Sequence, residues 1–438
     1  QITPDSVLQL VLMENEENKR SYTLEELKEL LNKLMLMSGK GEQGNSEVDK
    51  FAEIFSNVQR LAGSFIDLYL AGNMLFRTWE AEIHCEDNAR VSVFMSFNID
   101  EIDELQGQEA LTDLLPDICK TMERLLDEWL AFVNKKRSQL YYLNYYTAEQ
   151  VVYLCQQYQM RDISEEALVM LSFIKPDCKK IDTINSCFPK ANSRFLTAVN
   201  QPDMMDFAME LENCTDVSKK LELVWKFSMD NMSSFFPGCL DLDTLGTSLA
   251  ALAELNEKPI NRDLHPSLQP GRPNLILCPP SDILSCAIAI YMHSSGEQLP
   301  SYDEVLLCTP HTTYEEVALF LRRCLTAGYS GKKIYSLIYA DQLSYDIGYK
   351  SELLFQQLQA QGMDKYSLVI ICNSDREHCY IPSVFSQFKI HMIPQGQPVA
   401  IHRYLCTHFK VGSDVVSAAS VFKDGMSAGI VSSKRAGV

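Results

Sequence analysis

Residues 274–282 read Asn-Leu-Ile-Leu-Cys-Pro-Pro-Ser-Asp, a short apolar run that ends in a polar, proline-containing loop. Similar runs follow, so that five lie at 274–278, 304–309, 335–340, 367–372 and 389–393. The first four begin 30, 31 and 32 residues apart and the fifth begins 22 residues later, which suits strands that alternate with helices. The runs are apolar almost throughout, as are strands covered on both faces. They predict a five-stranded parallel sheet with helices at 283–293, 314–325, 352–361 and 382–388.

A sheet of this kind suits either a flavodoxin-like domain or a nucleotide-binding ATPase core, and the loops distinguish the two. An ATPase needs a glycine-rich loop after the first strand, with a Lys for the outer phosphates and a hydroxyl for magnesium. Here that position holds a different set, namely Cys278, Pro279, Pro280, Ser281 and Asp282. The two prolines remove two N–H donors, and the Asp puts a carboxylate where a phosphate would bind. We therefore expect a degenerate phosphate loop that binds no ATP.

Polar residues also follow the third and fourth predicted strands. Asp341 and Gln342 match the acid pair of a Walker B site, except that the second acid is replaced by an amide, which cannot accept a proton from the attacking water. Asn373 ends the fourth strand, where such ATPases carry a residue that senses the outer phosphate. In this order, these residues favour an ATPase core that has lost its catalytic groups.

In residues 1–270 the apolar residues recur mainly at helical spacing, which predicts a mostly helical linker or arm. Thr23 and Glu26 form a capping box ahead of a predicted helix at 24–37. A long helix is expected from 51 to about 70, then one strand at 90–97, then helices from about 101 that include 122–133, 148–158 and 221–227. His84 and His265 are the histidines of this region, and neither has a nucleophile or metal-spaced partner nearby in sequence.

Charge and cysteine usage exclude several classes of function. The chain carries 39 basic and 58 acidic residues, a net charge of −19, and residues 271–438 hold 14 of each, so the acidic excess lies in residues 1–270. This charge opposes binding to nucleic acid or to an anionic membrane. The 14 cysteines show no zinc-ligand spacing, which predicts reduced thiols, no bound metal and a cytosolic location. No apolar stretch is long enough to be a transmembrane segment.

The last residues resemble the opening of a second module. About thirty residues, 395–425, are left for a short helical lid, and residues 426–431 form an apolar run that predicts a strand. A partial phosphate loop then follows, consisting of Lys434, Arg435, Ala436, Gly437 and Val438. If this interpretation is correct, the chain is part of a longer protein and should continue as Gly-Lys-Ser or Gly-Lys-Thr.

Taken in order, these residues resemble the mysterin family of giant RING-type ubiquitin-protein ligases, which are built around a dynein-like ring of AAA+ modules. The resemblance covers the whole chain: a helical linker in 1–270, a degenerate AAA+ core of the P-loop NTPase type in 271–394, a lid in 395–425 and the start of a second module in 426–438. It implies that this first module is a nucleotide-free part of the ring.

The resemblance also implies cofactors and partners, all of the parent protein. ATP and magnesium would bind in later modules, and zinc in the ligase domains. The partners would be other AAA+ modules of the same chain, a ubiquitin-conjugating enzyme and protein substrates, with a cytoplasmic location and association with lipid droplets. This segment itself would not be an enzyme. The alternative is a free-standing scaffold whose pseudo-nucleotide domain binds proteins; a dynein-type motor would need a track-binding stalk that this sequence does not encode.

Overall fold

The computed structural model describes residues 10–15, 18–23, 25–26, 29–30, 32–33, 36, 46–77, 79–85, 90–97, 105–110, 114–157, 163–176, 178, 204–231, 241–256, 259–293, 298–361 and 365–409. The chain divides into two compact units. Unit 1 comprises residues 1–259 together with 321–330, and unit 2 comprises 260–320 together with 331–438. Among the described helices, none has the length and apolar character needed to cross a bilayer.

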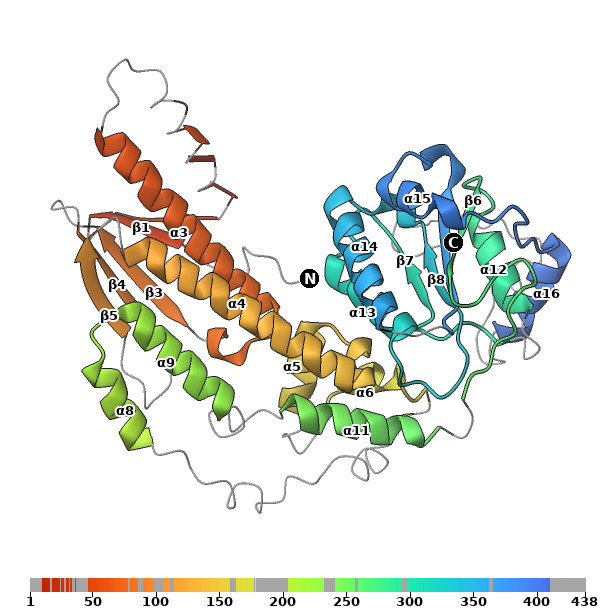
Figure 1. Cartoon of the computed structure of the whole chain (residues 1–438), viewed down its shortest axis with the longest axis horizontal. Coiled ribbons are helices and arrows are strands. Elements are labelled where there is room, and N and C mark those ends of the chain that lie inside the picture. The colour runs from red at the N-terminus through yellow and green to blue at the C-terminus, as the bar shows by residue number, and fades with distance from the viewer. Residues whose placement is uncertain are drawn as a thin grey trace, which may run out of the picture. The chain divides into compact units, whose positions relative to one another are not determined.

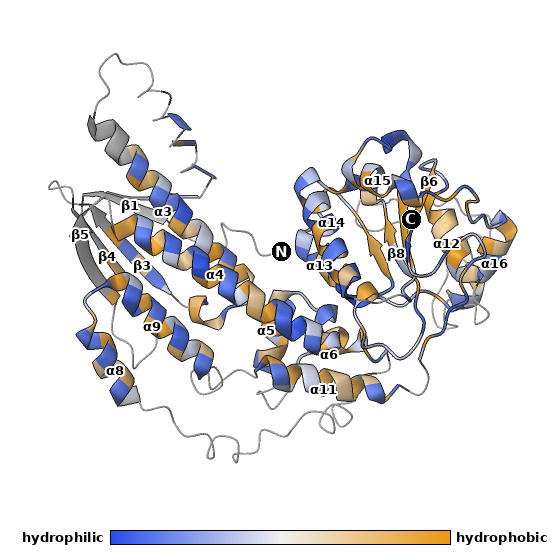
Figure 2. Ribbon diagram, viewed as in Figure 1, coloured by the Kyte–Doolittle hydropathy of each residue, from blue (hydrophilic) through white to orange (hydrophobic). Residues whose placement is uncertain are grey.

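Three helices form the framework of the first part of unit 1. They are α3 (Ser46–Leu70), α4 (Leu114–Gln139) and α9 (Val217–Asp230), and α3 and α4 lie side by side (Figure 1). Polar and apolar residues alternate along α4 and α9, so each helix has one face for the core and one for water (Figure 2). Asp216 begins α9 by accepting hydrogen bonds from the backbone N–H groups of Ser218 and Lys219.

A three-stranded antiparallel sheet accompanies these helices. It consists of β3 (Glu80–Cys85), β4 (Arg90–Ser96) and β5 (Leu105–Ala110), in that order. The predicted strand at 90–97 is therefore confirmed as β4, but the expectation that helices resume at about 101 is wrong, because β5 occupies that stretch. Residues 105–110 read Leu-Gln-Gly-Gln-Glu-Ala, which has little strand character by itself and becomes a strand by pairing with β4.

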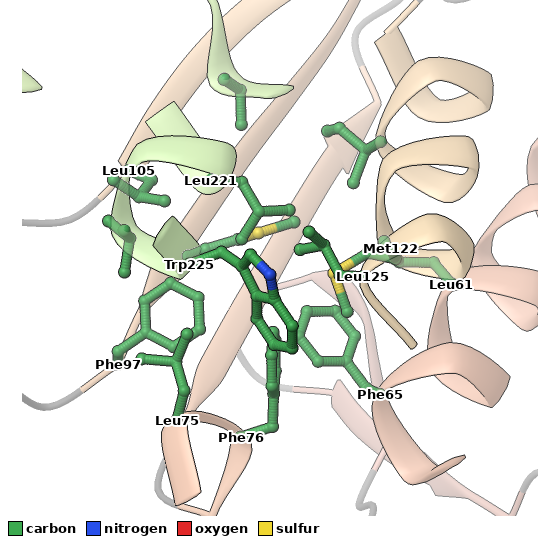
Figure 3. Packing of buried hydrophobic residues seen from close by; sticks show 14 of the residues in the cluster. Leu61, Phe65, Leu75, Phe76, Phe97, Leu105, Met122, Leu125, Leu221 and Trp225 are labelled. Atoms are coloured by element: carbon green, nitrogen blue, oxygen red, sulfur yellow. The ribbon is translucent and has the colours of Figure 1, made fainter. Parts of the chain in front are cut away.

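Aromatic side chains fill the core between this sheet and the helices (Figure 3). Phe76 lies in the short helix η1 (Met74–Phe76) and contacts three other rings, those of Phe65, Phe97 and Trp225, at centroid distances of 5.4, 5.5 and 6.3 Å. Phe76 is fully buried, so the ring joins helix, sheet and α9 in one apolar cluster.

A second cluster in unit 1 is built around the tyrosine-rich turn η2 (Tyr141–Tyr145). It packs with three helices, α5 (Ala148–Gln157), α6 (Glu165–Ser172) and α11 (Leu242–Glu254). Residues 321–330 also belong here: Arg323 Nη1 donates to the carbonyl oxygen of Asn144 over 2.6 Å, and the Tyr141 hydroxyl donates to the carbonyl oxygen of Arg323 over 3.1 Å. These tyrosines are thus packing residues.

The remaining elements of unit 1 are the hairpin β1 (Leu10–Asn15) and β2 (Asn18–Tyr22) and the helix α8 (Met204–Asn213). The predicted capping box is present, because Thr23 N–H donates to Glu26 Oε2 over 2.8 Å and Glu26 N–H donates to Thr23 Oγ1 over 3.2 Å. The described positions between 25 and 36 are helical. The predicted mostly helical region is thus confirmed, but it carries two antiparallel sheets where the sequence indicated a single strand.

Unit 2 contains a parallel sheet of four strands in the order β6-β9-β8-β7. The strands are β6 (Pro273–Cys278), β7 (Val305–Leu307), β8 (Tyr335–Ile338) and β9 (Leu368–Asn373). Helices α12 (Ile283–Met292) and α16 (Pro398–His408) lie on one side of the sheet, and α13 (Tyr314–Leu325) and α14 (Tyr345–Ala360) lie on the other (Figure 1). The first four predicted strands and an α/β module with a parallel sheet are confirmed.

The fifth predicted strand, 389–393, is not confirmed. Lys389 makes an isolated parallel bridge with Leu275, and Ile390 N–H donates to the Leu275 carbonyl oxygen over 2.9 Å. Pairing does not extend further: His391 and Met392 are exposed, Met392 at 77%, and Ile393 packs against the core without joining the sheet. The short helix predicted at 382–388 appears as α15 (Tyr380–Val384) and η5 (Ser386–Phe388). Helix α16 falls within the predicted lid, whereas 410–425 and the predicted second module at 426–438 lie outside the described residues.

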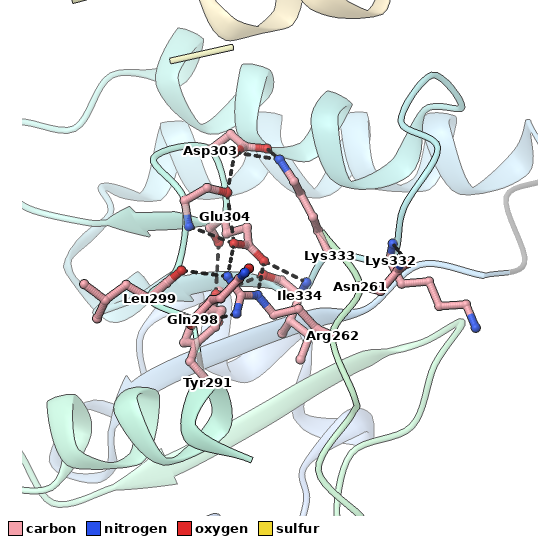
Figure 4. Close-up of polar contacts among 12 residues, drawn as sticks. Asn261, Arg262, Tyr291, Gln298, Leu299, Asp303, Glu304, Lys332, Lys333 and Ile334 are labelled. Carbon is pink, nitrogen blue, oxygen red and sulfur yellow. Dashed lines mark hydrogen bonds and ion pairs between the residues drawn. The ribbon is translucent and has the colours of Figure 1, made fainter. Parts of the chain in front are cut away.

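A buried ionic network supports the amino-terminal edge of this sheet (Figure 4). Arg262 forms a two-pronged ion pair with Glu304, the residue that precedes β7, and donates to the carbonyl oxygens of Gln298 and Leu299. Lys333, just before β8, pairs with Asp303 at 2.8 Å. The network ties the starts of β7 and β8 to each other and to the segment that carries Arg262.

Candidate functional site at the carboxyl edge of the parallel sheet

The loops that follow β6, β9 and β8 lie next to one another because these strands are parallel neighbours in the sheet. Ligands of open α/β sheets bind outside this edge. The three sets of residues singled out from the sequence, those after β6, after β8 and after β9, all belong to it. The edge is therefore the candidate functional site of unit 2.

The loop after β6 is a tight, exposed turn that closes on itself. Asp282 N–H donates to the Pro279 carbonyl oxygen over 2.9 Å, and the Ser281 hydroxyl donates to Asp282 Oδ1 over 2.9 Å. Pro279 and Pro280 have no N–H, and the Asp282 N–H is already used within the turn. A phosphate is normally held by several free N–H groups at such a helix start, so this loop retains few donors and adds a carboxylate.

Asp341 is buried at the end of β8, within the short helix η3 (Ala340–Gln342). Its Oδ1 accepts a hydrogen bond from the Asn373 backbone N–H over 2.9 Å, and its Oδ2 lies 3.5 Å from Arg376 Nη1. Tyr339, which precedes η3, has a left-handed backbone with φ of 57° that turns the chain into this position. The Asp341 carboxylate thus links the ends of β8 and β9 through Oδ1. Its Oδ2, which a metal ion would need as a free ligand, lies next to Arg376.

Gln342 and Asn373 each make a hydrogen bond within their own turn, Gln342 through its main chain and Asn373 through its side chain. The Gln342 N–H donates to the Tyr339 carbonyl oxygen over 2.9 Å. The Asn373 side-chain oxygen accepts from Asp375 N–H over 2.9 Å and so caps η4 (Ser374–Arg376). This short helix brings Arg376 to Asp341. The Asn373 side chain therefore acts as a cap, and its Oδ1 is already occupied.

Four buried cysteines lie near this edge, namely Cys278, Cys286, Cys308 and Cys372. Burial, and next the Asp341 carboxylate, raise the pKa values of Cys308 and Cys372 above the ordinary thiol value. A hydrogen bond with Cys278 and then burial raise the pKa of Cys286. These thiols therefore stay protonated and act as small apolar residues beneath the site. In the part of the chain that the structure describes, no three His, Cys, Asp or Glu side chains are grouped to hold a metal ion.

The structure brings together Asp341, Gln342 and Asn373 at one edge with the loop of Cys278, Pro279, Pro280, Ser281 and Asp282. The terminal set, Lys434, Arg435, Ala436, Gly437 and Val438, lies outside the described residues. Sequence reasoning missed Arg376 and the left-handed residue Tyr339. A basic residue three positions after the Asn that ends β9 was the available signal for Arg376, but its carboxylate partner is 35 residues away along the chain.

Comparison with known proteins gives a consistent result. The family described as the RNF213 AAA domain matches residues 273–390. The whole chain is similar to E3 ubiquitin-protein ligase RNF213 of Homo sapiens, with 47% identity over 444 residues, and to that of Mus musculus, with 48% identity over 445 residues. It is 35% identical over 450 residues to E3 ubiquitin-protein ligase rnf213-beta of Danio rerio, which covers 99% of the chain. The chain spans only 8–9% of the length of these relatives.

Proposed function

We propose that the chain, which is similar over its whole length to RNF213 ligases, serves as a non-catalytic linker and a nucleotide-free AAA module within a much longer ATP-dependent ubiquitin-protein ligase. In this role unit 2 supports the assembly of a ring of AAA modules. It helps to couple ATP binding and hydrolysis in other modules to ubiquitin transfer elsewhere in the parent protein. The segment itself performs no reaction.

The proposal extends to the partners and cofactors of the parent protein. Its immediate partners are the other AAA modules of the same chain, and a ubiquitin-conjugating enzyme and protein substrates bind elsewhere. ATP and magnesium belong to later modules and zinc to the ligase domains, in a cytoplasmic protein that associates with lipid droplets. The free-standing scaffold is the weaker alternative, because the relatives carry this entire segment within far longer chains.

The observation that carries the proposal is the occupied state of Asp341. In a working ATPase the corresponding acid acts on magnesium, and a second acid, replaced here by Gln342, accepts a proton from the attacking water. Here the Asp341 carboxylate already accepts the Asn373 N–H and pairs with Arg376, whose positive charge takes the place of a cation. The loop after β6 has no lysine, and Asp282 puts a carboxylate where a phosphate would bind. These features support a module that binds no nucleotide.

A calorimetric titration of the whole 438-residue chain with ATP and magnesium tests the nucleotide-free state. We expect no binding heat. A matched variant, Arg376→Ala, frees one Asp341 oxygen but leaves the loop after β6 unchanged, and it should also stay silent, because the loop lacks donors. Micromolar binding by either protein would contradict the proposal.

The role in the ring is tested in the full-length parent protein. Gln342→Ala removes the amide at the position of the second acid, and we expect ATP turnover and ubiquitin transfer to remain unchanged. Glu304→Gln weakens the buried network that supports the sheet and should lower both activities through loss of the module. A fall in ATP turnover with Gln342→Ala, with the thermal stability unchanged, would show that the site is catalytic.

A further inference from the structure

Two exposed tyrosines and a half-buried one form a compact group on α14 and α15 of unit 2. Tyr345 and Tyr349 lie one turn apart on α14, with ring centroids 6.4 Å apart and ring planes within 4° of parallel. Tyr380, the first residue of α15, stands nearly perpendicular to both, at centroid distances of 4.8 and 6.3 Å and angles of 76° and 81°. We call these three residues the tyrosine platform.

Local sequence brings the third ring into place. Gly348 lies on α14 beside the platform, and a Cβ atom at that position would come within 3.0 Å of the Tyr380 ring. The absence of a side chain therefore lets Tyr380 pack against the helix. The Tyr380 hydroxyl donates to Glu352 Oε2 over 2.6 Å, which fixes the ring from its other end.

The platform is not part of the apolar core. Tyr345 is 70% exposed and Tyr349 is 44% exposed, and Leu353 continues the same face of α14 at 40%. Tyrosines at helical spacing usually pack inward, so a set of rings that faces water and is held by a glycine and a hydrogen bond calls for a binding role.

The charges around the platform favour a cation. Glu352 is held by Tyr380 and by Gln356 Nε2 at 2.8 Å, and among the described residues no Lys or Arg forms an ion pair with it. The hydrogen bond to Glu352 raises the pKa of Tyr380 to about 12, so the phenol stays neutral beside the carboxylate. Lys350, the nearby base on α14, is paired with Asp346 at 2.9 Å.

From this geometry we propose that the tyrosine platform binds an arginine side chain of a partner protein. A cation within about 6 Å of an aromatic centroid is attracted by the ring face, and the short distances among these three rings allow one cation to contact all of them. A guanidinium group is planar, so it stacks on a ring face and still has N–H groups that point to Glu352. A lysine ammonium would satisfy the charge but not the stacking.

The test uses the whole chain with ¹³C-labelled tyrosine and follows the ring signals by NMR while the peptide acetyl-Gly-Arg-Gly-amide is added. The same peptide with citrulline has nearly the same shape without the charge, and peptides with lysine or trimethyl-lysine offer other cations. Spectra of the Phe variants assign the signals of Tyr345, Tyr349 and Tyr380.

We expect the arginine peptide to shift the three platform signals and to bind more tightly than the other three peptides. Tyr345→Ala or Tyr349→Ala should weaken binding by about 2- to 30-fold, the range of a cation–ring contact. Tyr345→Phe keeps the ring face and should bind the arginine peptide as tightly as the unsubstituted chain does. Tyr314→Ala, which removes a partly exposed tyrosine at the start of α13, is the matched control and should also have no effect.

Several outcomes would overturn the proposal. They are the absence of any platform shift at about 10 mM arginine peptide, equal binding of the citrulline peptide, tighter binding of lysine or trimethyl-lysine, and equal losses with Tyr314→Ala. Circular dichroism of each variant checks that the fold is intact, and Tyr349→Leu gives a second variant that keeps an apolar side chain on α14 but removes the aromatic face.

Discussion

Arg262 Nε lies 2.7 Å from Glu304 Oε1, and the two side chains are 1% and 0% exposed. The guanidinium also stands over the ring of Tyr291, 5.1 Å from its centroid, and its other N–H groups reach backbone carbonyls. A buried pair is stable only when its remaining donors and acceptors are satisfied, as they are here. The pair therefore stabilises the start of β7 and offers a direct test of the fold of unit 2.

Glu304→Gln removes the negative partner and leaves the Arg262 charge buried. Breaking a buried pair in this way costs about 3–5 kcal/mol of unfolding free energy, because the remaining charge has no compensation. We expect a lower denaturant midpoint for the exposure of the buried thiols Cys278, Cys308 and Cys372, measured by their reaction with a thiol reagent. Mass spectrometry of the labelled peptides separates these thiols from the buried thiols of unit 1, such as Cys119 and Cys155, so the signal reports unit 2.

The double variant Arg262→Met with Glu304→Leu is the control for that experiment. It removes both charges and keeps apolar volume, so its loss of stability should be smaller than that of Glu304→Gln alone. An equal or larger loss would show that shape, and not the uncompensated charge, determines the effect.

Gly328 lies against Tyr141 within unit 1, and Gly328→Ala should destabilise that unit. The glycine has φ of 154°, and an added Cβ would come within 2.3 Å of Tyr141 Cβ. Such overpacking costs about 1–3 kcal/mol. The three tryptophans of the chain, Trp79, Trp129 and Trp225, all lie in unit 1, so the midpoint of their fluorescence change during urea unfolding measures the effect.

Gly63→Ala is the matched control, because Gly63 lies inside α3 with no atom within 4 Å of the added Cβ. Alanine is favoured over glycine in a helix interior by about 0.5–1 kcal/mol, so this variant should raise the same midpoint. If the two variants shifted the midpoint equally, the close approach of Gly328 to Tyr141 would have no energetic weight.

His265 predicts a pH dependence of the stability of unit 2. Burial, and next the positive charge of His293, lower the pKa of His265, whose Nδ1 accepts a hydrogen bond from Ser267 N–H over 3.2 Å. The unfolded chain then binds the proton more readily, since its pKa is about 6.5. Stability from this group is thus complete above that value and is lost as the pH falls through it.

His265→Asn keeps a short acceptor at this position and removes the titration. Between about pH 7.5 and 5.5, the denaturant midpoint for exposure of the buried thiols should fall less in the variant than in the unsubstituted chain. A steeper fall in the variant would mean that the histidine gains, instead of losing, stabilisation when protonated.

The chain should hold no stoichiometric zinc. Elemental analysis after dialysis measures this directly. One surface pair could retain traces of metal: on α16, Cys406 Sγ lies 3.7 Å from His402 Nε2, four residues earlier. Any such zinc should disappear in Cys406→Ser. One zinc per chain that survives this substitution would contradict the prediction and place a metal site in this segment.

Sequence patterns predicted unit 2 better than unit 1. The strands β6, β8 and β9 are buried on both faces, so their continuous apolar runs are visible in the sequence. In unit 1 the polar strand β5 exists through its pairing with β4, with Leu105 opposite Met95, and nothing in residues 105–110 themselves indicates it. At 389–393 the sequence predicted a strand that is not formed, because the apolar run continues past the residues that pair with β6.

The site shows the same division. The sequence by itself determined the residue types at the carboxyl edge: two prolines and Asp282 after β6, Asp341 and Gln342 after β8, and Asn373 after β9. Only the tertiary structure decided that Arg376 pairs with Asp341 and that Tyr380 lies across Tyr345 and Tyr349. The physical reason is that side-chain type and local hydrogen bonding depend on near neighbours. Ion pairs and ring contacts depend on which strands are adjacent, and that adjacency arises when the apolar faces of distant segments are buried together.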